Sequence, residues 1–275
     1  MSNVNVYEIV TNQIIKRLEE GVIPWRRPFQ SHIPVNWNTQ RPYRGINTIL
    51  LPPGEYATFN QIKKAGGKVK KGEKSHIAIF WKLLEKENED GEIVKIPIAR
   101  YYRVFEINTQ VIGLESRRKI VEYEHDPIEE AEKIKDNYID PPSFTFEPTG
   151  AWYRPSEDRI NVPPMKEFEN VNEFYSVMFH EMIHSTGHKS RLNREGVTGE
   201  IKFGSKTYSE EELIAEIGAS ILCSHTGIIH ETIDNSAAYI NHWLGVLRED
   251  NRFIFKVAQQ AQKAVDYILG KRYED

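Results

Sequence analysis

Two histidines four residues apart, with a glutamate directly after the first, are the residues of this chain best suited to bind a metal ion. His180, Glu181 and His184 form the pattern H-E-x-x-H in an apolar stretch, 174–184, that contains neither Pro nor Gly. Its apolar residues recur close to helical spacing, so we expect a helix. Residues four apart share a helix face, so both imidazoles can reach one ion while Glu181 reaches a water on it. The pattern therefore predicts a zinc site that activates water for hydrolysis.

A zinc site of this kind needs a third protein ligand, and more than one residue could supply it. In a common three-histidine pattern a histidine follows Gly187 by three residues, but Ser190 stands there. His188 is one alternative. Glu212 and Glu216 are the others, because they lie four apart on one face of a second expected helix, Y-S-E-E-E-L-I-A-E-I-G-A.

The stretch that carries the two glutamates resembles the second helix of the gluzincin metallopeptidases, E-x-x-x-D. In that family the first acid binds the metal and the second holds a ligand histidine. The resemblance implies that Glu212 is the third ligand. It also implies that Glu216 accepts a hydrogen bond from an imidazole N–H, which fixes the tautomer. A structural alternative also fits, because residues 210–212 could simply place negative charge at a helix N-terminus.

Other elements are expected to shape a cleft around the motif. Residues 150–154 and 158–162 have the pattern of two short strands joined by a turn. In zincins a strand edge above the metal pairs with an extended substrate, and a purely structural hairpin is the alternative interpretation. Four side chains could supply a second electrophile: Tyr208, His188, His225 and His242.

Helices and strands follow one another irregularly along the chain, which predicts an α+β fold with a mostly helical C-terminal part. Helical spacing, caps and Gly or Pro breaks predict helices at 4–20, 58–67, 127–138, 236–249 and 252–269. Two strands, 77–81 and 99–105, flank an acidic stretch, 85–92, that is expected to form a hairpin tip. The charged residues 115–126 are expected to link two domains, 1–125 and 126–275.

The two halves of the chain differ in charge. Residues 1–125 contain 20 Lys and Arg against 14 Asp and Glu, a net charge of +6. Residues 126–275 contain 16 against 26, a net charge of −10. A basic half joined to an acidic half indicates a different partner for each, and nucleic acid is a candidate for the basic half.

Sequence features that would direct the chain to a membrane or an oxidising compartment are missing. A single cysteine, Cys223, excludes an internal disulfide. The first 21 residues lack the apolar core of a secretion signal, and no apolar run approaches the roughly 20 residues that span a bilayer. We therefore expect a cytoplasmic protein without membrane attachment.

A loop-rich segment, 22–47, mixes aromatic side chains with arginines. Single-stranded nucleic acid is bound by such mixtures, because aromatic faces stack on unpaired bases and cations follow the phosphates. The alternative is that the aromatic residues belong to the core and the arginines are only solvated. The candidate contacts are Trp25, Arg26, Arg27, Asn36, Arg41, Tyr43, Arg44 and Asn47, together with Lys70, Lys71 and Lys74 from a basic turn before the first long strand.

Several motifs of the first half occur in the order seen in the N-terminal domain of ArdC-type antirestriction proteins. They are P-W-R-R-P, R-P-Y-R-G-I-N, T-F-N-Q-I-K-K-A-G-G-K-V-K-K-G-E-K, I-F-W-K and Y-R-V-F-E-I-N-T-Q-V-I-G-L. In the second half, H-E-M-I-H-S-T-G-H-K-S-R-L-N-R and Y-S-E-E-E-L-I-A-E-I-G-A-S are similar to the zincin-like domain of the same family. The resemblance covers nearly the whole chain and is far more specific than H-E-x-x-H alone.

This resemblance implies a domain that binds single-stranded DNA fused to a zinc metallopeptidase-like domain. It further implies a role in protecting the incoming DNA of a mobile element, such as a conjugative plasmid, from host restriction. Three hypotheses follow. The chain is a zinc peptidase tethered to single-stranded DNA and acting on an unknown protein substrate, a DNA-protecting protein whose metal site is structural or vestigial, or an interaction module with neither activity. The presence of Glu181 favours the first hypothesis over the second, because a structural metal site has no use for this carboxylate.

Overall fold

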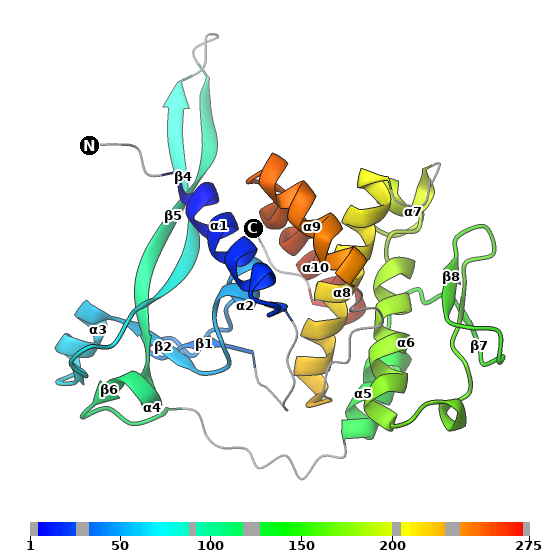
Figure 1. Cartoon of the computed structure of the whole chain (residues 1–275), viewed down its shortest axis with the longest axis horizontal. Coiled ribbons are helices and arrows are strands. Elements are labelled where there is room, and N and C mark those ends of the chain that lie inside the picture. The colour runs from blue at the N-terminus through cyan, green and yellow to red at the C-terminus, as the bar shows by residue number, and fades with distance from the viewer. Residues whose placement is uncertain are drawn as a thin grey trace.

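The computed structural model describes residues 5–25, 33–87, 92–117, 127–199, 205–228 and 237–271. These residues form two α+β domains, in agreement with the expected fold class (Figure 1). A sheet with short helices makes up most of the N-terminal domain, and a layer of helices flanked by a small sheet makes up the C-terminal domain. The boundary at 125/126 remains a prediction, because residues 118–126 lie outside the described part of the chain.

The N-terminal domain is built on a four-stranded sheet of order β1-β2-β5-β4. β1 pairs parallel with β2, and the other neighbours pair antiparallel. A two-stranded ladder of β3 and β6 lies beside it. In chain order the elements are α1 (Val6–Glu19), β1 (Val35–Asn36), α2 (Ile46–Leu50), β2 (Glu55–Thr58), α3 (Phe59–Lys64), β3 (Lys68–Val69), β4 (His76–Glu87), β5 (Ile93–Glu106), α4 (Ile107–Gln110) and β6 (Val111–Ile112).

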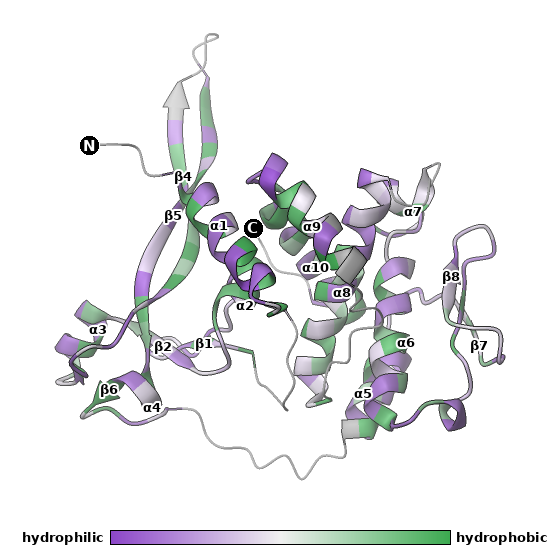
Figure 2. Cartoon of the chain, viewed as in Figure 1, coloured by the Kyte–Doolittle hydropathy of each residue, from purple (hydrophilic) through white to green (hydrophobic). Residues whose placement is uncertain are grey.

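The hairpin of β4 and β5 extends well beyond the rest of the domain as a two-stranded arm (Figure 1). Its register runs from His76 opposite Val104 to Glu87 opposite Ile93, so the strands are longer than predicted and continue into the acidic stretch. Residues 88–91 lie outside the described residues. Large apolar side chains remain exposed on the arm, such as Leu83 at 58% and Ile93 at 71%, and Figure 2 shows hydrophobic positions along it.

The C-terminal domain packs helices against each other and against the three-stranded sheet β7-β9-β8. β7 pairs parallel with β9, and β8 pairs antiparallel with β9. In chain order the elements are α5 (Pro127–Asp136), β7 (Ser143–Thr145), β8 (Trp152–Arg154), β9 (Arg159–Asn161), the 3-10 helix η1 (Met165–Glu167), α6 (Val171–Ser185), α7 (Glu195–Thr198), α8 (Lys206–Thr226), α9 (Ala237–Glu249) and α10 (Phe253–Ile268).

Close packing of α6 against α8 brings the two expected site helices together. Gly218 makes this approach possible, because a Cβ there would lie 2.6 Å from Cδ1 of Ile183. Ala215 and Ala219 on the same helix are also fully buried. Small residues thus allow the acidic positions of α8 to face the histidines of α6.

Helix α1 completes the hydrophobic core of the C-terminal domain. Val10, Ile14 and Leu18 of α1 are 0–2% exposed and belong to the same buried cluster as α6, α8 and α10. The side-chain hydroxyl of Thr11 donates to the backbone carbonyl of Asn251 at 2.9 Å. The two domains are therefore joined by a shared interior as well as by the chain between them.

The expected helices agree with the structure to within a few residues, but some short elements do not follow from the sequence pattern. α3 begins with the capping box of Thr58 and Gln61, in which each side chain bonds the other residue's backbone N–H. α2 begins at Ile46 and Asn47, which were expected to lie in a loop. It forms because its five residues are all buried between β4 and α10, so tertiary packing stabilises a single turn.

Within the described residues, none of the helices is both long and apolar enough to cross a bilayer.

Acid should destabilise the protein through His225, in the last turn of α8. Burial, with the positive charges of Lys271 and Arg44, lowers the pKa of His225 from 6.5 to about 4. The folded state holds a neutral ring, so between these pH values the unfolded chain binds the extra proton. We expect the free energy of unfolding to fall by up to about 3 kcal/mol as pH decreases through that interval. Urea unfolding with chelator, in wild type and in His225→Gln, measures it; an equal fall in the variant would contradict this assignment.

Candidate metal centre

Helix α6 carries the histidines and the intervening glutamate on a buried face. Asn170 caps its N-terminus by accepting hydrogen bonds from two backbone N–H groups of the first turn. The apolar stretch then continues without a breaking residue to Ser185, which confirms the expected helix. His180 and Glu181 are each only 6% exposed. Their side chains thus point into the domain, where a polar group needs a partner.

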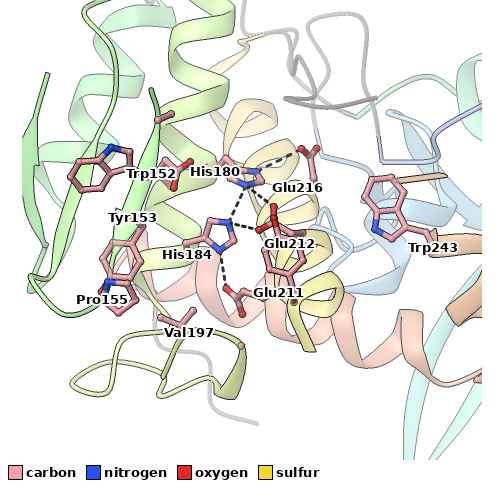
Figure 3. A pocket seen from close by; sticks show the side chains of 14 residues that line it. Trp152, Tyr153, Pro155, His180, His184, Val197, Glu211, Glu212, Glu216 and Trp243 are labelled. Atoms are coloured by element: carbon pink, nitrogen blue, oxygen red, sulfur yellow. Dashed lines mark hydrogen bonds and ion pairs between the residues drawn. The ribbon is translucent and has the colours of Figure 1, made fainter. Parts of the chain in front are cut away.

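Glu212 of α8 faces both imidazoles across a short gap (Figure 3). The Nε2 atoms of His180 and His184 lie 3.0 Å apart, and the Glu212 carboxylate oxygens lie 3.5 Å from Nε2 of His180 and 3.7 Å from Nε2 of His184. Two ligand atoms each about 2 Å from one ion, at tetrahedral angles, are about 3.3 Å apart. The three groups therefore fit a single cation. No other group of metal-ligating side chains with this geometry occurs among the described residues.

The orientation of the two imidazole rings also fits a cation. Each ring turns Nδ1 toward a carboxylate: Glu211 lies 3.1 Å from Nδ1 of His184, and Glu216 lies 3.7 Å from Nδ1 of His180. An ionised carboxylate only accepts hydrogen bonds, so Nδ1 of His184 carries a proton. The two Nε2 atoms then face each other at 3.0 Å, a separation that requires a proton or a metal cation between them.

Glu211 holds His184, and the sequence analysis did not single it out. The Arg194 guanidinium donates two hydrogen bonds to this carboxylate, from Nε at 2.9 Å and Nη2 at 2.7 Å. Its remaining donors reach Thr186 Oγ1 at 2.6 Å and the Ile183 carbonyl at 2.8 Å. Burial acts to raise the pKa of Glu211, but Arg194 outweighs it and keeps the pKa below its usual value. A buried, ionised acceptor thus fixes the orientation of the ligand ring.

Glu216 and Glu211 each face the Nδ1 atom of a different histidine. The resemblance to gluzincins implied Glu216 as acceptor for a ligand imidazole, and the structure places Glu216 beside His180. At 3.7 Å its oxygen is farther from the ring nitrogen than a direct hydrogen bond allows. His188, the other rival for the metal, bonds Ser190 through Nδ1 at 2.8 Å and is not part of the group that faces the gap.

The electrostatics of the site favour a cation. Burial lowers the pKa of His184, but the carboxylates of Glu212, Glu211 and Glu181 outweigh burial and raise it to about 9. Burial raises the pKa of Glu212, but the two facing histidines outweigh it and lower that pKa. Negative charge is thus concentrated around the two ring nitrogens.

Glu181 lies in the same cavity but outside the group of three. The cavity has a volume of about 530 Å³ and is also lined by β8, by the α7 region and by Tyr208. The backbone N–H of Tyr153 donates to the Glu181 carboxylate, and burial raises the pKa of Glu181. This carboxylate is thereby held at the wall of the cavity by the edge strand β8.

Comparisons with known proteins agree with this geometry. The family model for the N-terminal domain of the anti-restriction factor ArdC matches residues 4–105, and that for a zincin-like metallopeptidase matches residues 138–260. The crystal structure of the antirestriction ArdC protein from the R388 plasmid, in its metal-free form, is 33% identical with a TM-score of 0.78. The match covers 98% of this chain and 100% of that one. This chain belongs to the ArdC family of antirestriction proteins.

Other proteins are similar to this chain over nearly its whole length. The Mn(II)-bound structure of the R388 ArdC protein matches with a TM-score of 0.77 and 33% identity, over 97% of each chain. The uncharacterized protein y4eC of Sinorhizobium fredii is 32% identical, over 98% of this chain and 92% of that protein. DNA primase TraC of Escherichia coli is 33% identical, but the chain spans only 27% of its length. The zincin-like match and the metal-bound relative together support a divalent-metal site in this ArdC family member.

In this ArdC-family chain, β8 forms the edge strand of its sheet and lies along the metal cavity. The hairpin of β8 and β9 is anchored by Asp158, which pairs with Arg191 and accepts a hydrogen bond from the Tyr153 hydroxyl at 2.8 Å. The Arg191 side chain is fully buried and also donates to the Ser185 carbonyl at 2.8 Å. The hairpin is thus fixed to the end of the metal-site helix, in a position where an extended peptide could pair with it.

The structure also separates the four candidates for a second electrophile. Tyr208 lines the metal cavity and hydrogen-bonds Glu212. His188 and His225 are not among the cavity-lining residues, and the side chain of His242 lies outside the described part of the chain. Tyr208 is therefore the candidate that the geometry retains.

The predicted DNA contacts do not form one surface, and the prediction for Trp25 is wrong. Trp25 is only 1% exposed and packs edge-to-face against Trp243 at 5.2 Å between ring centroids. Its ring is covered and therefore cannot stack on a base. Arg26 and Arg27 lie outside the described residues.

Two predicted amide contacts serve the fold instead. Asn47 is buried, donates to the Ile79 carbonyl at 2.7 Å and accepts from the Ile79 N–H at 2.6 Å. The side-chain oxygen of Asn36 accepts hydrogen bonds within the turn that follows it. Their polar atoms are thus engaged inside the protein, so neither amide is available to read a base without losing these contacts.

The remaining predicted contacts lie in two places. Tyr43 and Arg44 line a large cavity beside α10, and Arg44 pairs there with Asp266. Three lysines lie in the turn between β3 and β4, where Lys70 donates to the Thr109 carbonyl at 2.6 Å and two are exposed. Among the members of the set that the structure describes, the exposed cations are Arg41, Lys71 and Lys74.

Proposed function

We propose that the chain is a zinc-dependent peptidase tethered to single-stranded DNA, which acts in protecting a mobile element's DNA from restriction. The observation that carries the peptidase half is the convergence of His180, His184 and Glu212 in a cavity bordered by Glu181 and the β8 edge. Two imidazoles and one carboxylate are the ligand set of a catalytic zinc site with an open position. The family relationship and the basic N-terminal half support the DNA half.

Each residue has a distinct role in this proposal. His180, His184 and Glu212 hold the ion, and Glu211 and Glu216 orient the two rings. A metal bound there supplies Lewis acidity toward water and toward a peptide carbonyl. Glu181 takes a proton from the attacking water and passes it to the leaving amine. The β8 edge aligns an extended peptide through backbone hydrogen bonds, and the Tyr208 hydroxyl lies in the same cavity as a further donor.

A structural or vestigial metal site is the alternative proposal, in which the protein protects DNA without proteolysis. Structural zinc sites are usually closed by four protein ligands. The described residues bring three such groups together beside an open cavity of about 530 Å³, with a buried carboxylate at its wall. This arrangement favours the catalytic interpretation.

Removal of the metal ligands is expected to abolish metal binding. We expect wild type to bind about one Zn²⁺ per chain with three protein ligands, and His180→Ala/His184→Ala to bind none. Glu212→Ala should weaken binding by a large factor because one ligand is lost. Plasma mass spectrometry after dialysis against Zn²⁺ or Mn²⁺ measures content and preference. Glu181→Gln is the control and should keep the ion, whereas unchanged metal content in the double variant would refute the assignment.

A further inference from the structure

A second and larger cavity, of about 1030 Å³, lies between the N-terminal domain and α10, apart from the metal centre. One wall is formed by α1, residues 42–47 and β4, and the other by α10 with the residues that follow it. We propose that this cavity, here named the interdomain groove, binds single-stranded DNA and that α10 of the peptidase domain supplies cations for its phosphates. This inference rests on the proposed single-strand binding and assigns it a place.

A row of cations on α10 faces the groove. Arg252, Lys256 and Lys263 line it, and all three are exposed, with Lys256 also paired with Glu210 of α8 at 2.6 Å. They are spaced by four and seven residues, so they share one side of the helix and extend over about 16 Å. The opposite side of α10 is buried in the core, so the three cations can contact a ligand only from the side that faces the groove. A linear array of this kind suits a linear array of phosphates.

Aromatic rings gather at one end of the same groove. Tyr7, Trp81 and Phe255 form a cluster, with centroids 4.8 Å apart for Tyr7 and Phe255 and 6.3 Å apart for Tyr7 and Trp81. The Arg252 guanidinium lies 5.0 Å from the Tyr7 ring centroid. Trp81 is 50% exposed, so one face can stack on an unpaired base. The cluster therefore adds base contacts to the phosphate contacts of α10.

The floor of the groove is fixed by contacts between the two domains. Arg44 pairs with Asp266 of α10, and the backbone N–H of Gly45 donates to Gln262 at 3.1 Å. At this end burial lowers the pKa of Lys271, although Asp266 opposes that shift and outweighs the smaller effect of Arg44. Lys271 and Arg44 nevertheless outnumber the one acidic residue, Asp266, in the lining of the groove. A preformed positive channel needs little rearrangement to accept a strand.

The groove fits this role better than the basic turn between β3 and β4. That turn carries exposed lysines, but it does not contribute to the groove or to its aromatic cluster. Duplex DNA would expose no base face to Trp81, whereas a single strand offers both bases and phosphates. The chemistry of the groove therefore selects an unpaired strand.

The test uses the full chain and fluorescence anisotropy with a labelled oligothymidylate of about 15 nucleotides, over a range of salt concentrations. Arg252→Glu/Lys263→Glu should weaken binding at least tenfold and reduce the salt dependence, because two phosphate contacts are lost. The matched control, Lys63→Glu/Lys64→Glu on exposed positions of α3, makes the same change in net charge and should stay within about threefold. Circular dichroism and metal content confirm that both variants fold.

The outcomes separate this inference from the proposed function. If wild type binds but the two variants lose affinity equally, or only the α3 variant loses it, single-strand binding stands and the groove is wrong. If wild type binds no oligonucleotide at low salt, the proposed single-strand binding itself fails. An oligouridylate of equal length tests the nucleic acid: tighter binding of DNA supports the inference, and preference for RNA overturns it. Photocrosslinking of iodouracil-substituted DNA to the peptide that contains Trp81 would support the groove directly.

Discussion

Replacement of Glu181 by Gln is expected to reduce peptide hydrolysis by about 10²–10⁴-fold while leaving the metal bound. Glutamine keeps the volume of the side chain and its hydrogen bond from the Tyr153 N–H, but it cannot accept a proton from water. Since Glu181 lies outside the group of three that faces the gap, the ion should remain. Loss of activity at constant metal content would thus separate proton transfer from metal binding.

Fluorescein-labelled casein is a suitable probe, with and without a saturating oligothymidylate. Metal content measured on the same samples is the control, and Tyr208→Phe should show a smaller loss because its hydroxyl only assists. Cleavage by Glu181→Gln at the wild-type rate would rule out this mechanism. Absence of cleavage by wild type under both conditions would favour the non-proteolytic alternative.

Glu211→Ala is expected to be the most destabilising substitution at the site, by about 3–5 kcal/mol. Glu211 is 4% exposed and Arg194 is 7% exposed, so removal of the carboxylate leaves a buried guanidinium without its ion pair. The variant also frees Nδ1 of His184 from the acceptor that orients it. We expect metal affinity to fall about 10–100-fold in whatever fraction remains folded.

Glu210→Ala is the matched control, because it removes a carboxylate one position earlier on the same helix. Glu210 pairs with Lys256, whose side chain is 59% exposed, so the loss should be below about 1 kcal/mol. Chemical denaturation with excess chelator measures stability, and calorimetric titration with Zn²⁺ measures affinity. Equal destabilisation by the two substitutions would show that the buried network around Glu211 does not stabilise the fold.

The metal centre was largely predictable because its geometry is local. Spacing of four within a helix determines that two side chains share a face, so His180 with His184, and Glu212 with Glu216, could be paired from the sequence. Their convergence depends on the packing of α6 against α8, which the small residues of α8 permit. Glu211 was missed because Arg194 and His184 approach it from different segments, and no spacing within the run of three acids gave Glu211 a role of its own.

The proposed nucleic-acid surface was less predictable because it depends on tertiary contacts. Trp25 was predicted to stack on an unpaired base. It packs instead on Trp243, more than two hundred positions farther along the chain. The cations of α10 lie in the half with net negative charge, so charge per half concealed them. Composition reports the sum of charges, whereas binding depends on which charges share one face.

The insertion of α1 into the interior of the C-terminal domain has a consequence for how the molecule responds to cutting. A protease that severs the connection between residues 117 and 127 would produce a nicked protein whose pieces remain associated, since Val10, Ile14 and Leu18 stay buried in the shared core and α1 packs against α9. Such a sample would run as two bands under denaturing electrophoresis and elute as one particle in size-exclusion chromatography. A fragment that begins after the cut would lack α1. The apolar surface that α1 covers would then be exposed, and the fragment would self-associate.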